Sequence, residues 1–228
     1  MHARFKVNET IGKIDVDLPD YLDELAIADL KDGFASVRCI GDDNILFRGP
    51  RAVTSKLAIS VKGDRNRIIL GSDVNLEGSI SIGGSHITVL IGAATTFNQV
   101  RIFCKGRLHG VYIGRDCMFS SDVEIRTSDS HSIVDLDAMK KLNEPDGVYI
   151  GDHVWVSKRV FVQKGAVIGD DNIVGFGASV FGEIRGSNAR IVGAPAQAVT
   201  SKRVTWSRKG NIRLPDDDLY AWKDLPLL

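Results

Sequence analysis

The sequence predicts an all-β solenoid, in which short parallel strands are wound into stacked coils. Two repeats predict it: an aliphatic residue returns every six positions in residues 150–184, and a looser repeat of twenty-one residues precedes it. The composition agrees, because a chain with 23 glycines, 6 prolines and 7% aromatic residues is neither collagen-like nor of low complexity. With 43% hydrophobic and 25% charged residues, the 228-residue chain can bury a core.

The six-residue repeat is the stricter of the two. Its aliphatic positions are Ile150, Val156, Val162, Ile168, Val174 and Val180, and the same step links Ile113, Phe119 and Ile125. This period fits neither a helix nor simple strand alternation, but it fits a short strand plus a turn, three of which close one triangular coil. We expect the glycines after the aliphatic residues to supply corner conformations that side chains disfavour. A β-sandwich of short strands is the alternative, and it gives no reason for a constant step of six.

The upstream repeat predicts larger coils. One series, spaced by twenty-one residues, is Ile40, Val61, Ile82 and Phe103. A second series, in which glycine follows each member, is Leu70, Ile91 and Ile113. A spacing of twenty-one corresponds to one coil of about eighteen residues with about three more in its turns. We therefore place the solenoid at residues 36–199.

Both ends of the chain lack the repeat. Residues 1–35 predict an N-terminal cap segment that contains a short helix over residues 17–32. The apolar face of this helix consists of Leu18, Tyr21, Leu22 and Leu25. Gly33 suits its C-terminus, and a cap of this kind covers the open end of a stack of coils. Residues 200–228 form a C-terminal tail.

The repeat is interrupted between Ile125 and Ile150, so residues 126–149 predict a loop extruded from the coil. Loops on a rigid scaffold often carry function, and this one contains His131 in the sequence TSDSHS. Histidine can take a proton near neutral pH because its ordinary pKa is about 6.5. The alternative is an exposed loop histidine without a role.

Charge and cysteine content exclude several classes of protein. The 29 basic residues balance 29 acidic ones, which argues against a general nucleic-acid binder. Three cysteines cannot all pair with one another and show no zinc spacing, so we expect buried thiols in a reducing compartment. No apolar run predicts a secretion signal or a membrane span, and we expect a cytoplasmic protein.

The hexapeptide ladder, the loop sequence SDSHSI and the segment IGDHVWVS together resemble the left-handed β-helix acyltransferases, and within them most closely the sugar and polysaccharide O-acetyltransferases. The resemblance covers residues 36–199. It implies a single-stranded left-handed parallel β-helix and a homotrimer with active sites between neighbouring subunits. It also implies acetyl transfer from acetyl-CoA to a hydroxyl of a carbohydrate acceptor of the capsule, exopolysaccharide or lipopolysaccharide type, with no metal.

The resemblance assigns two catalytic residues. His131 occupies the place of the general base, which removes the proton from the acceptor hydroxyl as its oxygen attacks the thioester. Trp155 stands where the family has a tryptophan beside the site, and its indole N–H could donate to the acetyl oxyanion. Packing beside Val156 is the alternative for this tryptophan.

The resemblance also assigns residues that bind the two substrates. Asn98 matches a residue that contacts the acceptor, or it is a turn residue. The positions that match contacts of acetyl-CoA are Lys158, Gly175, Phe176 and Lys202. Lys158 could meet a phosphate or be solvated. A basic run over residues 185–213, with seven basic residues and no acidic one, suits the phosphates of CoA.

Three other functions are compatible with a solenoid. Streptogramin-type antibiotics are acetylated by similar proteins. A γ-type carbonic anhydrase would use zinc, and His109, His131 and His153 are spaced by twenty-two residues, but three ligands in tight geometry are needed and His153 is expected to face solvent. A non-catalytic scaffold would not need a histidine-bearing loop followed by a tryptophan.

Overall fold

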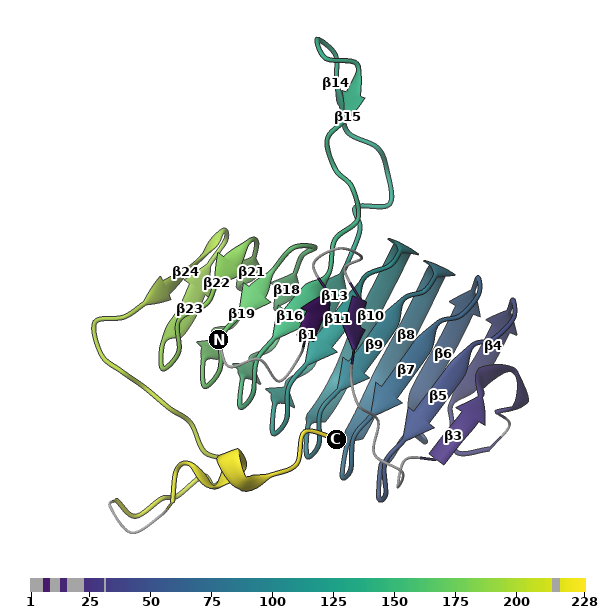
Figure 1. Ribbon diagram of the computed structural model, residues 1–228. Helices are drawn as coiled ribbons and strands as arrows, with labels where there is room; N and C mark the ends of the chain where they lie inside the picture. The colour runs from purple at the N-terminus through teal and green to yellow at the C-terminus, as the bar shows by residue number, and fades with distance from the viewer. Residues whose placement is uncertain (1–5, 9–12, 16–22, 31, 215–217) are drawn as a thin grey trace.

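The computed structural model describes residues 6–8, 13–15, 23–30, 32–214 and 218–228. The chain forms a left-handed parallel β-helix whose coils stack along one axis (Figure 1). Each complete coil has three sides, which we call faces I, II and III, joined by the corners I/II, II/III and III/I. The fold class expected from the six-residue repeat is therefore confirmed.

Face III is one eight-stranded sheet. Its strands are β3 (Asp23–Ala26), β5 (Ile45–Arg48), β7 (Arg67–Leu70), β9 (Thr88–Ile91), β11 (Gly110–Ile113), β16 (Val148–Ile150), β19 (Val167–Ile168) and β22 (Glu183–Ile184). All pairs are parallel except β3–β5.

Faces I and II join in a twelve-stranded sheet, because β8 (Asn75–Ser85) and β10 (Thr96–Arg107) run round the I/II corner. The other strands of face I are β12 (Met118–Phe119), β17 (Trp155–Val156), β20 (Ile173–Val174), β23 (Arg190–Gly193) and β24 (Ala196–Val199). The other strands of face II are β4 (Ser36–Ile40), β6 (Leu57–Lys62), β13 (Val123–Arg126), β18 (Phe161–Val162) and β21 (Ser179–Val180).

Two hairpins and two short 3₁₀ helices complete the described chain. The hairpins are β1 (Lys6–Asn8) with β2 (Lys13–Asp15), and β14 (Val134–Asp135) with β15 (Lys140–Lys141). The helices are η1 (Ile27–Asp29) and η2 (Ala221–Asp224). In the part of the chain that the structure describes, no helix has the length and apolar composition needed to span a membrane.

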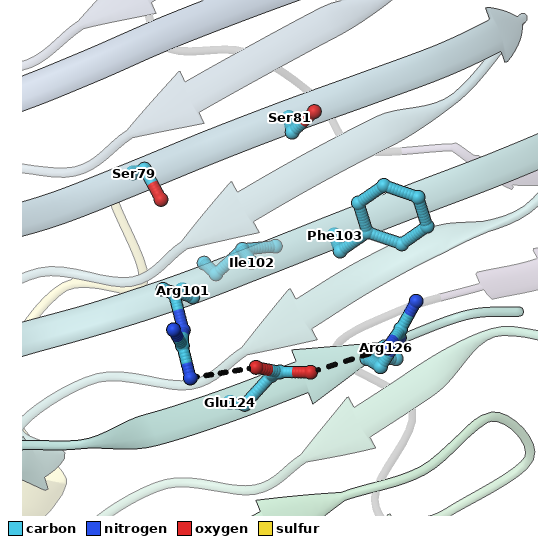
Figure 2. A pocket seen from close by; sticks show the side chains of 7 residues that line it. All are labelled: Ser79, Ser81, Arg101, Ile102, Phe103, Glu124 and Arg126. Atoms are coloured by element: carbon cyan, nitrogen blue, oxygen red, sulfur yellow. Dashed lines mark hydrogen bonds and ion pairs between the residues drawn. The ribbon is translucent and has the colours of Figure 1, made fainter. Parts of the chain in front are cut away.

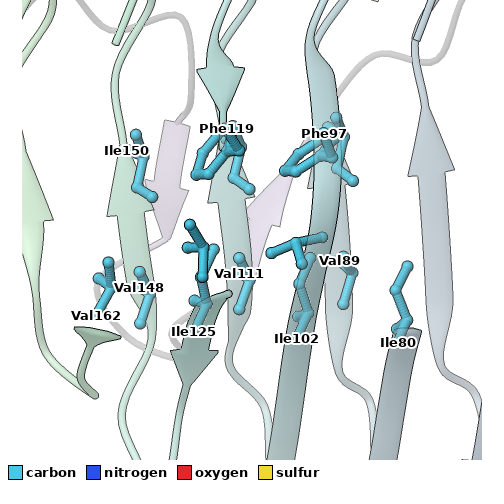
Figure 3. Packing of buried hydrophobic residues seen from close by; sticks show 14 of the residues in the cluster. Ile80, Val89, Phe97, Ile102, Val111, Phe119, Ile125, Val148, Ile150 and Val162 are labelled. Carbon is cyan, nitrogen blue, oxygen red and sulfur yellow. The ribbon is translucent and has the colours of Figure 1, made fainter. Parts of the chain in front are cut away.

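The aliphatic ladder forms the core. All six hexapeptide positions from Ile150 to Val180 are at most 2% exposed, as the repeat predicts. Figure 3 shows inward side chains of successive coils lying in rows, with Phe97 beside Phe119. These two rings stack with their centroids 4.5 Å apart. Burial of apolar area at about 25 cal/mol per Å² makes this ladder the main stabilising feature of the coil.

The upstream ladder differs from the predicted one at both ends. The inward register joins Cys39 to Val61, Val61 to Ile82 and Ile82 to Cys104. Ile40 is 48% exposed, and Phe103 lies on the outer surface. The coils differ by one residue in turn length, and a slip of one residue turns a strand side chain to the opposite face. The second predicted series is correct, since Leu70, Ile91 and Ile113 are buried and aligned.

The predicted N-terminal helix is not formed by residues 23–30. Residues 23–26 form β3, which pairs antiparallel with β5 and places Leu25 opposite Leu46. Residues 27–29 form the single turn of η1, and Ile27 is fully buried. The free edge of β5 offers unpaired backbone groups, and β3 satisfies them, which a helix could not do. Residues 17–22 and 31 lie outside the described residues.

All three cysteines are free, as expected. Cys104 and Cys117 are buried in the coil, and Cys39 is half-buried. Burial raises the pKa of the Cys104 thiol to about 12, and it also raises the pKa of Cys117. These two thiols are therefore packing residues and not nucleophiles.

The C-terminal tail forms a strap, residues 200–214 and 218–228, that returns along the III/I corner toward the early coils (Figure 1). Successive strap residues bond successive coils: Val204 to Asn188, Thr205 to Asp171, Trp206 to His153 and Arg208 to Asp116. At its end, the Leu227 carbonyl accepts the Ala93 N–H at 2.9 Å. Leu228 packs on the outer side of face III.

Candidate active site

The extruded segment leaves the coil at the II/III corner, between β13 and β16, and β14 and β15 project far from the prism (Figure 1). Its base is fixed by Thr127, which is fully buried. The Thr127 N–H donates to the Phe103 carbonyl at 3.1 Å, and the Thr127 carbonyl accepts the Asp146 N–H at 3.0 Å. The two limbs of the segment are thus held together where they meet the coil.

His131 lies just beyond this base, with an exposed side chain. Its backbone is held by Asn143 of the opposite limb, which is 7% exposed. The Asn143 Nδ2 donates to the His131 carbonyl and to Asp129 Oδ2, both at 2.8 Å, while its Oδ1 accepts the Ile133 N–H at 2.7 Å. These three hydrogen bonds hold the Asn143 side chain in one position. They thereby fix the backbone that carries the exposed imidazole of His131.

A salt bridge ties the same segment to the next coil. Lys164 Nζ lies 2.9 Å from Asp129 Oδ2. Hydrogen bonds from Lys164 and then from Asn143 lower the pKa of the Asp129 carboxyl, so it is ionised at neutral pH. Lys105 Nζ also approaches the Ser130 carbonyl at 3.4 Å. The residues before His131 are therefore anchored from three sides.

Trp155 lies on face I, away from the corner that carries His131. It pairs with Met118 and Ile173 of neighbouring coils. Its side chain is half-buried, and the ring of Trp206 in the strap lies 6.3 Å away at an angle of 47°. Within one chain, the coil thus separates the two residues that the resemblance assigns to catalysis.

Four of the five predicted substrate-binding residues lie along the I/II corner, and Lys202 lies in the strap. Asn98, Lys158 and Phe176 are exposed at this corner on different coils. The Gly177 N–H donates to the Lys158 carbonyl at 3.1 Å, and this hydrogen bond joins two neighbouring coils at the corner. Gly175 is half-buried, and an added Cβ there would lie 2.9 Å from Val192 Cγ1.

Among the described residues, the charged side chains at the I/II corner form only exposed contacts within the chain. Lys158 Nζ lies 3.5 Å from Asp122 Oδ2, with both side chains nearly half exposed. The guanidinium of Arg159 lies 5.8 Å from the centre of the Phe176 ring. Such exposed contacts contribute little to stability and leave the cations available to a ligand.

Two arginines of the basic C-terminal run contact the coil. Lys202 is exposed at the start of the strap. Arg203 donates to Asn188 Oδ1 at 2.9 Å, and Arg208 donates to Asp116 Oδ1 at 2.8 Å. These two arginines therefore hold the strap on the coil.

His153 was expected to face solvent, and the structure contradicts this. It is 4% exposed, and its ring lies between Trp206 and Trp222 with centroids 4.3 and 5.1 Å away. Its Nδ1 lies 2.9 Å from Asp171 Oδ1. The strap covers this histidine, and its two tryptophans were the signal in the sequence.

The described residues contain no group of three side chains that could hold a metal ion. His109 is buried near the II/III corner, where its Nε2 lies 3.1 Å from the Lys105 carbonyl. His153 is buried at the III/I corner among strap residues. His109 and His153 therefore lie at different corners of the coil, and within one chain they do not share a zinc site with His131.

No protein-family profile matches the chain. A polysialic acid O-acetyltransferase from Neisseria meningitidis is 31% identical over 128 residues, which cover 55% of this chain and 58% of that protein. A polysialic acid O-acetyltransferase from Escherichia coli O1:K1 / APEC is 30% identical over 158 residues, which cover 69% of this chain and 48% of that protein. The chain thus spans about half the length of these curated relatives.

Two solved structures share the fold. The polySia specific acetyltransferase NeuO superposes with a TM-score of 0.73 at 24% identity, covering 82% of this chain and 95% of that chain. The polysialic acid O-acetyltransferase OatWY superposes with a TM-score of 0.63 at 23% identity, covering 82% and 98%. The resemblance first carried by the ladder and the histidine loop is confirmed: this chain is similar in sequence to polysialic acid O-acetyltransferases and shares the left-handed β-helix fold.

Proposed function

We propose that the protein is an acetyl-CoA-dependent O-acetyltransferase that modifies a hydroxyl of a sugar or surface polysaccharide. The observation that carries the proposal is the exposed imidazole of His131 on a backbone fixed by Asn143. The relatives support the reaction, since both are named as O-acetyltransferases of a polysaccharide.

His131 is the general base of this reaction. It takes the proton of the acceptor hydroxyl while the hydroxyl oxygen attacks the thioester carbonyl carbon. The carbon–sulfur bond then breaks, and His131 returns the proton to the CoA thiolate. Positioned base catalysis of this kind contributes about 10²–10⁴-fold. The Trp155 indole N–H, or a backbone N–H nearby, donates to the oxyanion that forms between the two steps.

The I/II corner suits acetyl-CoA. Phe176 is 67% exposed and offers an apolar surface to the pantetheine arm, while Lys158 offers a cation to a phosphate. Gly175 leaves backbone groups accessible beside them. Lys202 is a further exposed cation beyond the last coil.

The site is completed between subunits of a homotrimer. His131 and Trp155 lie on different sides of one coil, so a second copy must supply one of them. The projecting hairpin supports this, because the residues that the structure describes leave its large apolar side chains uncovered: Ile133, Val134, Leu136, Met139 and Leu142 are 47–81% exposed. An exposed apolar surface of this kind is typical of an interface.

The experiment is an assay of CoA thiol release with acetyl-CoA and a panel of acidic and neutral glycans. We expect His131→Ala to reduce the rate by about 10²–10⁴-fold, with an unchanged circular dichroism spectrum. His86→Ala is the matched control, since His86 lies at the same corner on an earlier coil and should leave the rate unchanged. Equal rates for wild type and His131→Ala would refute the role of this histidine.

A further inference from the structure

The backbone directly before His131 has an unusual conformation. Ser130 has a φ of 68°, in the left-handed region that few residues other than glycine, asparagine and aspartate adopt. Within the extruded segment, residues 126–149, the other non-glycine residue with positive φ is Met139, which lies in the turn between β14 and β15. Such a conformation persists only where the surroundings hold it, and it is concentrated at functional sites.

Neighbouring side chains hold Ser130 at each of its polar groups. Its N–H donates to Ser128 Oγ at 3.1 Å, and its carbonyl accepts Lys105 Nζ at 3.4 Å. Its hydroxyl accepts a hydrogen bond from Arg126 Nη2 at 3.1 Å. Ser128 belongs to the loop itself, and the contact from the exposed Lys105 is long for a hydrogen bond. Arg126 therefore makes the shorter of these two links from Ser130 to the coil.

Arg126 is itself fixed by the sheet. It is the last residue of β13, and its backbone pairs with Phe103 of β10. Its guanidinium lies 4.8 Å from the centre of the Phe103 ring, and its Nη1 lies 3.4 Å from Glu124 Oε1 (Figure 2). The other oxygen of Glu124 lies 2.9 Å from Arg101 Nη2, so this carboxylate is held as well. The arginine thus reaches Ser130 with an orientation that the sheet sets.

Arg126 also leaves one of its donors unused. Its Nε is buried and makes no hydrogen bond with the part of the chain that the structure describes. A buried donor without a partner lowers stability, so hydrogen bonding within the coil does not account for the place of this side chain. What the side chain gains in this place is the bond to Ser130, at the foot of the loop that carries His131.

We propose that Arg126 is a positioning residue for acetyl transfer, which acts through Ser130 to set the backbone of His131. The inference rests on the proposed function, because it concerns the same general base. Asn143 holds the His131 carbonyl, and Arg126 holds the residue before it. The backbone is therefore fixed on both sides of the Cα that carries the imidazole. A general base must lie within hydrogen-bond reach of the proton it removes, and a displacement of about 1 Å can cost about 100-fold in rate.

The test is a double-mutant cycle of Arg126→Gln and Ser130→Ala, measured by CoA thiol release with the glycan that the wild type acetylates fastest. We expect each single variant to lower kcat about tenfold and to change KM less than about twofold, since only the position of the base is altered. The double variant should also be about tenfold slower, because both changes remove the same hydrogen bond, whereas independent effects would multiply to about 100-fold. Arg101→Gln is the matched control: it takes an equal charge from the same carboxylate, leaves the bond to Ser130 in place and should leave kcat unchanged.

Hydrogen exchange of the peptide over residues 127–133 gives a second measurement, which does not depend on activity. The amides of Ser130 and Ile133 donate hydrogen bonds in this peptide. We expect them to exchange several-fold faster in Arg126→Gln and in Ser130→Ala, because the loop is then held less firmly, and at the wild-type rate in Arg101→Gln.

Unchanged exchange in Arg126→Gln would overturn the inference, because the arginine would then not hold the loop. So would a cycle in which the two effects multiply, since Arg126 would then not act through Ser130. If the wild type transfers acetyl and Arg126→Gln transfers it equally fast, the inference fails and the proposed function stands. If the wild type itself releases no CoA with any glycan, the proposed function fails, and the exchange rates alone then decide whether Arg126 holds the loop.

Discussion

At the III/I corner, each coil places a glycine two residues before a residue with positive φ. The corner residues are Arg51, Asp73, Ala94, Asp116, His153, Asp171 and Asn188, with φ between 49° and 60°. The glycines were expected to supply this conformation, and they do not. They are needed for space: a Cβ on Gly92 would lie 2.6 Å from the Gly114 carbonyl carbon of the next coil. Aspartate or asparagine, both of which tolerate the left-handed region, takes the turn on four of these coils, and arginine, alanine or histidine takes it on the others.

This reading predicts different costs for two glycines of the same corner. We expect Gly92→Ala to lower the free energy of unfolding by about 1–3 kcal/mol, because backbone must move to admit the methyl group. Gly186→Ala should change it by less than about 0.5 kcal/mol, since an added Cβ there meets no atom within 4 Å. Urea unfolding of both variants checks the prediction. Similar costs would show that space is not the reason for these glycines.

The buried His109 predicts a loss of stability in mild acid. Burial lowers the pKa of its imidazole below the ordinary value, so the folded state favours the neutral ring. Its Nε2 faces the Lys105 carbonyl. The buried Nδ1 has no hydrogen-bond partner among the described residues, so an N–H formed there by protonation would have no acceptor. As pH falls below about 6.5, the unfolded chain takes the proton more readily, and stability falls.

The measurement compares urea midpoints at pH 7.5 and 5.5. The wild type should lose more stability between these pH values than His109→Gln, whatever the stability of the variant at pH 7.5. If the two proteins show the same difference, then His109 is not the group that titrates.

Sequence reasoning proposed residues for the candidate site and missed the side chains that hold His131 in place. His131 stands out because it interrupts a strict repeat. Asn143 and Lys164 do not stand out in the sequence. Asn143 contacts His131 only when the two limbs of the loop come together, and Lys164 contacts Asp129 only when the next coil is in place. A bond between residues far apart in sequence leaves no periodic signal in one chain.

At the scale of elements, the ladder from Ile113 to Val180 was predictable and the coil ends were not. A step of six leaves only one inward register, and the buried residues follow it. The upstream coils have longer strands, such as β8 and β10, where period-two alternation allows a slip of one residue. The first strand of face III, β3, is set by the open edge of β5 and not by its own sequence.

The strap is an element that the sequence did not predict, and Trp206 is its main anchor. This side chain is 5% exposed, stacks on His153 and donates from Nε1 to the His153 carbonyl at 2.9 Å. We expect Trp206→Ala to release the strap, since truncation of a buried tryptophan costs about 3–5 kcal/mol. Limited trypsin digestion should then cut at Lys202 and Lys209 at least several-fold faster.

The matched control is Tyr220→Ala, which removes an aromatic ring of the same strap that is 43% exposed. Its digestion rate should stay close to that of the wild type. Release of the strap should also lower acetyl transfer, because Trp206 packs beside Trp155. Unchanged digestion of the Trp206 variant would mean that other contacts are sufficient to hold the strap.

At the scale of the whole molecule, the hairpin β14–β15 is expected to contact a second copy. Leu136 and Met139 are 81% and 78% exposed, which is costly for an element without a partner. We predict that Leu136→Asp with Met139→Asp shifts the protein from trimer toward monomer in sedimentation velocity, with unchanged strand content. Lys140→Ala, on the same hairpin, should leave the mass unchanged. A double variant that remains fully trimeric would remove the hairpin from the interface.

The separation of His131 and Trp155 gives the most direct test of the account. Each single variant, His131→Ala and Trp155→Ala, should be inactive as a pure oligomer, because every site then lacks one of the two residues. Oligomers assembled from equal amounts of both variants should regain activity, since random mixing restores both residues in about one site in four. The measurement is the acetyl transfer rate of the mixed oligomers relative to wild type. Recovery to about a quarter is the predicted result, and a mixture as inactive as its components would contradict a site shared between subunits.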